Sequence, residues 1–165
     1  MTEKLNLRMF SISSFDIENI TAKPLLFDYG DNIKLDIRLH LAPSPSDFLY
    51  LVQKEAKAMP NGRLSPEQKN SINIISRINN VQVKEDITLR KTLQSFLTPI
   101  EGLKEFGDHG FYEINNQFNF SSSKTESNAI NHINRFELEV IWKTTSDLFS
   151  GEIMKIELPI IEMIR

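Results

Sequence analysis

The chain lacks cysteine and has little glycine, and each shortage removes a class of chemistry. Without cysteine there is no disulfide framework, no thiolate zinc site and no cysteine nucleophile. The 6 glycines are scattered at turns, and the sequence contains no Walker-type phosphate loop, no Gly-x-Gly-x-x-Gly and no Gly-x-Ser-x-Gly motif. We therefore expect no P-loop or dinucleotide chemistry and no cofactor.

An excess of positive charge and long apolar runs are also missing. Lys and Arg total 19 against 22 Asp and Glu, for a formal net charge of −3, and no basic cluster typical of a nucleic-acid interface is present. The longest unbroken apolar run is Phe48–Val52, far below the roughly 20 residues of a transmembrane helix. The first residues show no apolar signal-peptide core. We expect no nucleic-acid or membrane partner, and a soluble protein that is cytoplasmic or incorporated in a particle.

What the chain does contain is hydrophobic periodicity, and its period changes twice along the sequence. Residues 33–41 place an apolar side chain at every odd position and a polar one at every even position, which predicts a strand with one buried face. Weaker alternation extends this expectation over residues 4–41, and a period of two returns over residues 111–164. Both ends of the chain are therefore predicted to form strands.

The middle of the chain, residues 46–106, is instead predicted to be helical. A first helix can be capped by Ser46 or Asp47. Residues 65–68 (Ser-Pro-Glu-Gln) give a second helix a serine N-cap, a proline at its first position and a glutamine three residues after the cap. A third helix starts at Asp86. The apolar faces expected for the second and third helices are Ile72, Ile75 and Ile78 in the one, and Leu89, Leu93, Phe96 and Leu97 in the other.

The order of strands, helices and strands predicts an α+β fold of one domain over residues 1–165. A short fourth helix is predicted over residues 98–107, and a short strand over residues 81–83 is an alternative to helix there. Half-exposed alternation favours antiparallel pairing, because parallel sheets are covered on both faces. We expect a single, mostly antiparallel sheet built from the N-terminal and C-terminal strands, with three to four central helices packed on one face.

The densest group of polar residues follows the predicted helices. Carboxylates with one imidazole can bind a divalent cation and assist hydrolysis. The simpler interpretation is a polar turn, because Gly and Asp are turn residues in their own right. We favour the turn and keep a metal site as the alternative; its candidate ligands are Glu105, Asp108, His109 and Glu113.

Several apolar residues stand where a partner could contact them. Leu148 and Phe149 lie in the loop between the last two predicted strands, and must either fold back on the core or enter a partner. Pro159 predicts that the last strand is an edge strand or leaves the sheet near its end, and an apolar edge calls for a cover such as a strand from another subunit. The candidate interface residues are Leu148, Phe149, Ile141, Phe111, Ile160, Ile161 and Met163.

The missing catalytic motifs and these apolar positions favour a non-enzymatic protein-binding or assembly protein. It would act through surface contacts with a protein partner or by self-association. A composition rich in Ile and Asn favours a bacterial or phage source, and hence a structural subunit or adaptor of a multi-protein assembly. One alternative is a small metal-assisted hydrolase. Another is a carrier that holds a small apolar ligand among Phe118, Phe120, Trp142 and Ile75.

Overall fold

The computed structural model describes residues 2–20, 26–28, 31–58, 71–84, 86–101, 112–121 and 133–163. Within these residues the chain forms nine strands and one helix. In chain order they are β1 (Glu3–Lys4), β2 (Phe10–Asn19), β3 (Leu26–Asp28), β4 (Ile33–Pro43), α1 (Pro45–Ala58), β5 (Ser71–Lys84), β6 (Ile87–Glu101), β7 (Tyr112–Phe120), β8 (Ile133–Thr144) and β9 (Phe149–Met163).

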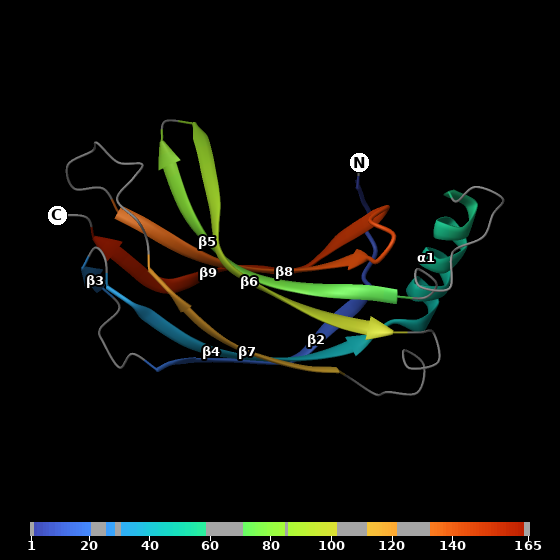
Figure 1. The fold of residues 1–165 in the computed structure, drawn as a ribbon, viewed down its shortest axis with the longest axis horizontal. Coiled ribbons are helices and arrows are strands. Elements are labelled where there is room, and N and C mark those ends of the chain that lie inside the picture. Colours follow the sequence, from blue (N-terminus) through green and yellow to red (C-terminus); the bar gives the residue numbers. More distant parts are fainter. Residues whose placement is uncertain are drawn as a thin grey trace.

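The strands form two sheets that lie face to face. The larger sheet has the order β1-β9-β8-β5-β6, with β3 also paired to β9, and the smaller has the order β2-β4-β7. Figure 1 shows the two layers with their long strands along a common axis and α1 at one end. The buried side chains of both sheets belong to one hydrophobic core. The architecture is a β-sandwich.

Strand β4 shows most directly how the sequence produces this fold. Over residues 33–41 its odd-numbered residues are buried and its even-numbered residues are exposed or half-buried, which confirms the strand predicted there. β4 pairs antiparallel with β2 on one side and with β7 on the other. Its five inward side chains are at most 1% exposed, so the centre of the smaller sheet is held chiefly by apolar burial.

The larger sheet contributes its own inward face to the same core. Phe136 and Trp142 of β8 are both fully buried, and the Phe136 ring meets Phe120 of the smaller sheet edge-on at 5.1 Å between centroids. Trp142 lies directly across from Gly151 in the β8–β9 ladder. A Cβ added at Gly151 would lie 2.5 Å from Cε2 of the indole, so the tryptophan fits only because this position has no side chain.

The prediction of three to four central helices is wrong. Residues 71–84 and 87–101 form the long antiparallel hairpin of β5 and β6, and β5 also pairs with β8. Six of the 14 residues of β5 are Ile or Val, which favour strands. The spacing of Ile72, Ile75 and Ile78 suggested one helical face, but Ile72 and Ile78 are buried while Ile75 is only half-buried, on the opposite face. In β6, Leu97 is 59% exposed, so its apolar residues form no core-facing helical stripe.

The prediction of a single sheet is also wrong, and with it the α+β class. Most of the described chain is strand, and among the described residues only α1 is helical. The predicted first helix is confirmed as α1, but it stands at the end of the sandwich instead of covering a face (Figure 1). The N-terminal strands divide between the sheets, because β2 and β4 join β7 while β1 and β3 join β9. No helix within the described residues has the length and apolar character of a membrane span.

Candidate functional site

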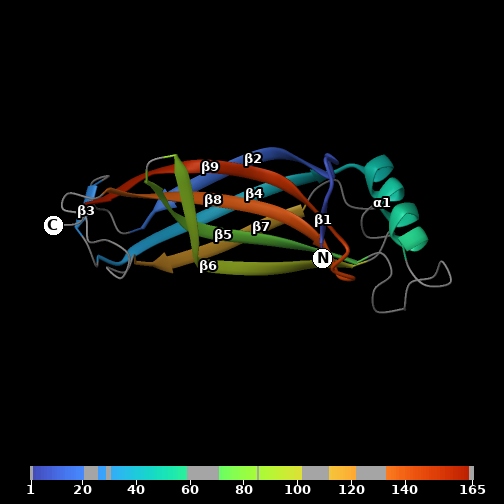
Figure 2. The same ribbon diagram turned by 90° about the horizontal axis from the view of Figure 1, so that it is seen from above.

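The two long sides of the sandwich differ in how completely they are closed. Figure 2 shows β6 and β7 along one side and β9 and β2 along the other. On the first side the backbone N–H of Asn119 in β7 donates a 2.7 Å hydrogen bond to Oε1 of Gln94 in β6. Close by, the rings of Phe96 and Phe118 pack edge-on at 4.9 Å. Side chains therefore join the two sheets along this side.

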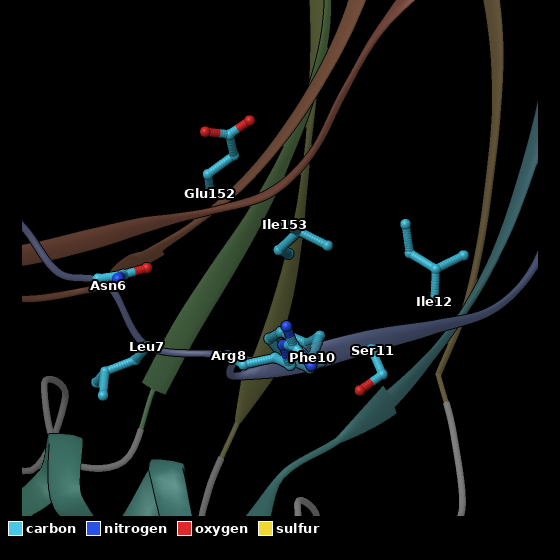
Figure 3. Close-up of a pocket in the computed structure, with 8 residues that line it drawn as sticks. All are labelled: Asn6, Leu7, Arg8, Phe10, Ser11, Ile12, Glu152 and Ile153. Carbon is cyan, nitrogen blue, oxygen red and sulfur yellow. The ribbon is translucent and has the colours of Figure 1, made fainter.

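The opposite side contains a groove of about 530 Å³ between β9 and β2. It opens where the chain leaves the larger sheet after β1 and crosses to the smaller sheet to begin β2. Figure 3 shows Ile12 rising from β2 toward β9, Ile153 extending from β9, and Glu152 pointing away from β2. The residues that line the groove are Asn6, Leu7, Arg8, Phe10, Ser11, Ile12, Glu152 and Ile153.

The groove is lined by four apolar and four polar or charged side chains. Ile12 is 40% exposed, whereas Leu7 and Ile153 are partly buried against the core. The Glu152 carboxylate lies 3.8 Å from Nζ of Lys4. Both side chains of this ion pair are largely exposed, so it contributes little to stability.

Next to the groove, β9 has an edge that the described strands leave uncovered. β1 pairs with Phe149 and Ser150 only, and β3 pairs with residues 161–163. Over residues 151–160, β9 is paired with β8 on one side, and no other strand of the described residues pairs with it on the other. Such an edge presents unpaired backbone N–H and C=O groups. Pro159 within this stretch is compatible with an edge position.

The outer face of the larger sheet carries a network of matched charges. The carboxylate of Glu139 accepts a hydrogen bond from Nε of Arg77 and lies 3.6 Å from Nζ of Lys155. Burial of Glu139 opposes its ionisation, but Arg77 and the other donors outweigh this effect and hold the pKa of the carboxyl below its ordinary value. Beside it, Glu137 is only 7% exposed and accepts a 3.1 Å hydrogen bond from Nε of Arg90.

This network lies where the far end of the β5–β6 hairpin rises away from the sandwich (Figure 1). The strand pairing shifts at Ile78 and Asn79, and Nδ2 of Asn79 donates to both Glu137 and Glu139, at 3.2 and 3.3 Å. Since each carboxylate has a cation and an amide as partners, the network accounts for how the bent hairpin is held to β8.

A second buried carboxyl joins α1 to the β8–β9 turn. Glu55 is 3% exposed, and its Oε2 accepts a 2.6 Å hydrogen bond from the hydroxyl of Ser146. Burial raises the pKa of Glu55, and the hydrogen bonds from Ser146 and Thr144 offset only part of that effect. Nζ of Lys54 on the same helix lies 5.8 Å from the centre of the Phe149 ring. The helix is therefore anchored through one acidic group and one cation–π contact.

The candidate interface residues occupy different environments. Phe149 is 4% exposed and belongs to the core, and Leu148 packs against that core, so this loop folds back on the protein itself. Ile141 is half-buried and pairs with Ile75 of β5. Phe111 lies outside the described residues. The backbones of three further candidates lie in β9: Ile160, Ile161 and Met163.

Only one of the candidate metal ligands can be placed. Glu105, Asp108 and His109 lie outside the described residues. Glu113 is exposed on β7, where its Oε1 accepts a 2.9 Å hydrogen bond from Asn115 and lies 3.7 Å from Nε2 of His40. The Asn115 hydrogen bond is the main cause of the lowered pKa of Glu113. Within the described residues, no group of three or more His, Asp or Glu is arranged to hold a metal ion.

The residues named for an apolar-ligand carrier lie mostly in the closed core. Phe118 and Trp142 are fully buried and Phe120 is 5% exposed, and these side chains pack against the rest of the core. The groove residues Ile12 and Ile153 were not predicted from the sequence. The weak alternation of residues 10–19 placed Ile12 in no distinctive pattern, and Pro159 alone pointed to the last strand as an edge strand or one that leaves the sheet near its end.

Comparison with known proteins adds little to this picture. No protein-family model and no curated protein matches the chain. Among solved structures, the sporulation control protein Spo0M from Bacillus subtilis aligns with a TM-score of 0.34 and 11% identity, over 95% of this chain and 49% of that one. The chain thus spans about half the length of that Spo0M chain. At this level the likeness carries no argument about function.

Proposed function

We propose that this protein is a non-enzymatic binding protein that contacts a protein partner on its open β2–β9 side. The observation that carries the proposal is the groove of about 530 Å³ beside the uncovered edge of β9. A non-obligate interface is about as apolar as the rest of a protein surface, and this groove carries apolar and polar side chains in equal number. In a multi-protein assembly of a bacterium or phage, the chain would act as an adaptor or structural subunit.

Three buried or half-buried carboxyls of the described residues are engaged in contacts that hold the fold together, which supports binding over catalysis. Glu137 and Glu139 are each paired with an arginine of the neighbouring strands, and Glu55 is engaged by Ser146. A general acid or base has to reach a substrate proton directly. These carboxyls are instead occupied in holding strands and helix together.

A site-specific photo-crosslinker tests the proposal. A benzophenone side chain at Ile12, inside the groove, should form a covalent adduct with a defined partner protein in the cells that produce this chain. The matched control is the same group at Leu97, which is 59% exposed on the closed side. Adducts at Ile12 and none at Leu97 support the proposal, whereas no adduct at Ile12, or equal adducts at both positions, contradicts it.

A further inference from the structure

The uncovered edge of β9 is flanked by strands at both of its ends. β1 pairs with it in parallel at Phe149 and Ser150, and β3 pairs in parallel at residues 161–163. At the first end, the backbone N–H of Leu5 donates a 2.7 Å hydrogen bond to the carbonyl of Ser150. The edge therefore already accepts added strands, and no strand of the described residues pairs with the part between the two.

The open part has the length of an ordinary strand. It covers residues 151–160 of β9, or about 33 Å at the usual rise of about 3.3 Å per residue. After β1 the protein's own chain turns away from this edge to build β2 in the other sheet. An extended segment of about eight to ten residues would fill the space between β1 and β3.

The inward side of such a segment would meet apolar surface. Met154 and Leu158 of β9 are buried and Ile153 is half-buried. Across the groove, β2 presents Ile12, which is 40% exposed. Because alternate side chains of a strand point to the same face, every second residue of the added segment would have to be apolar.

The outward side of the segment would meet carboxylates. Glu152 and Glu157 are both exposed on β9, whereas the ammonium of Lys155 between them is directed to Glu139 on β8 at 3.6 Å. Glu152 lies 3.8 Å from Lys4 and Glu157 lies 3.6 Å from Arg135 in loose surface ion pairs. Opposite charges directly across a strand pair are favourable, so the remaining residues of the segment should be basic.

We propose that β9 binds an extended segment of another protein as an added strand between β1 and β3, and that apolar and basic residues alternate along this segment. The inference rests on the proposed function and specifies its partner. In this mode the main-chain hydrogen bonds supply affinity and the alternate side chains supply specificity. The added strand would cover Ile12 and remove the free edge.

The direct test is hydrogen exchange on the intact protein with a synthetic peptide of ten residues in which valine and lysine alternate. Backbone amides within residues 151–158 should exchange slower by on the order of tenfold at saturating peptide. The same peptide methylated on alternate backbone nitrogens cannot form the ladder and should give no protection. A peptide with glutamate in place of lysine should bind weaker by about tenfold, since like charges across a strand pair repel.

A charge-reversal variant tests the outward contacts separately. In the double variant Glu152→Lys and Glu157→Lys, the glutamate peptide should become the tighter ligand. The matched control is Glu113→Lys, the same change on an exposed residue of β7, which should leave the preference for the lysine peptide intact. Thermal unfolding checks that both variants fold. An unchanged preference in the double variant overturns the charge assignment.

Two outcomes separate this inference from the proposed function. In the first outcome, the crosslinker at Ile12 captures a partner, but neither that partner nor the valine–lysine peptide protects the amides of residues 151–158. The proposed binding function then stands, and strand addition is overturned. If those amides become protected in the protein alone as its concentration rises, together with a doubled mass by light scattering, the occupant is a second copy and the proposed foreign segment is wrong.

Discussion

The two long sides of this sandwich differ in how the two sheets are joined along them. Along β6 and β7, one side-chain amide and one aromatic pair join the sheets: Gln94 accepts from Asn119, and Phe96 packs on Phe118. Along β9 and β2, the described residues leave a groove and a free strand edge. The first arrangement serves stability. The second leaves backbone groups and an isoleucine available to a partner.

The open side is protected against indiscriminate pairing. Charged side chains and proline on an edge strand discourage aggregation, and β9 places Glu152, Lys155, Glu157 and Pro159 along the uncovered stretch. In the proposed strand addition, the added strand has to match those charges. The contrast between the two sides can be tested by mutation.

The largest effect is expected from Gly151→Ala, at the base of the open side. The added methyl group would lie 2.5 Å from the buried Trp142 ring, and overpacking of a core typically costs about 1–3 kcal/mol, occasionally more. Denaturant unfolding measures it. The neighbouring Ser150→Ala should change the free energy of unfolding by about 0.5 kcal/mol or less. Equal stability of the two variants would contradict the packing described for the indole.

Truncating a side chain should lower the free energy of unfolding more on the closed side than on the open side. Phe96→Ala on the closed side removes the ring pair with Phe118 and should lower the free energy of unfolding by about 2 kcal/mol. Ile12→Ala on the open side removes an exposed side chain and should lower it by about 0.5 kcal/mol or less, while weakening partner binding. Similar losses of stability in both variants would remove the distinction between the sides.

A smaller effect is expected from Gln94→Ala. Its amide oxygen is the acceptor for the N–H of Asn119, and losing one such hydrogen bond costs about 1 kcal/mol. The exchange of the Asn119 amide should rise, as measured by NMR, while amides in the centre of β4 stay protected. If the Asn119 amide exchanges at its wild-type rate, Gln94 does not close this side.

The smallest effect concerns the end of the sandwich that both sides share. Burial raises the pKa of Glu55 from the ordinary 4.5. Because this pKa is higher in the folded state than in the unfolded state, protonation of Glu55 stabilises the folded protein. This stabilisation is fully present below the unfolded-state pKa and is lost as pH rises through the folded-state pKa. Glu55→Gln keeps an acceptor for Ser146 and removes the charge. It should be more stable than wild type at neutral pH.

The control for this prediction is the pH dependence itself. Near the acidic pH at which Glu55 is protonated in both the folded and the unfolded state, the variant and the wild type should unfold at similar denaturant concentrations. A constant stability difference at every pH would show that the change acts through packing and not through the carboxyl charge.

Local pattern was sufficient for part of the fold and not for the rest. The strict alternation of residues 33–41 identified β4, because one face of this strand is buried and the other is not. The apolar spacing in β5 led to a wrong prediction of helix. Ile72, Ile75 and Ile78 fit one face of a helix as well as they fit the two faces of a strand. Only pairing with β6 and β8 decides between them, and that pairing is not written in the local sequence.

The candidate site was harder to predict for the same reason. Whether β9 has a free edge depends on contacts far apart in the chain, such as the hydroxyl of Thr2 donating to the carbonyl of Asp147 at 2.9 Å. From Pro159 the sequence predicted that the last strand is an edge strand or leaves the sheet near its end, but it did not predict the groove at Ile12. For Phe149 it left two alternatives, and the structure places that ring in the core.

Backbone hydrogen exchange on the protein alone, followed by addition of the valine–lysine peptide, is the decisive experiment for the free edge of β9. Alternate amides of residues 151–158 should exchange quickly while the Asn119 amide exchanges slowly, and the peptide should slow only the former. Slow exchange along the whole of β9 before any peptide is added would show that its edge is already covered and that no strand can be added there.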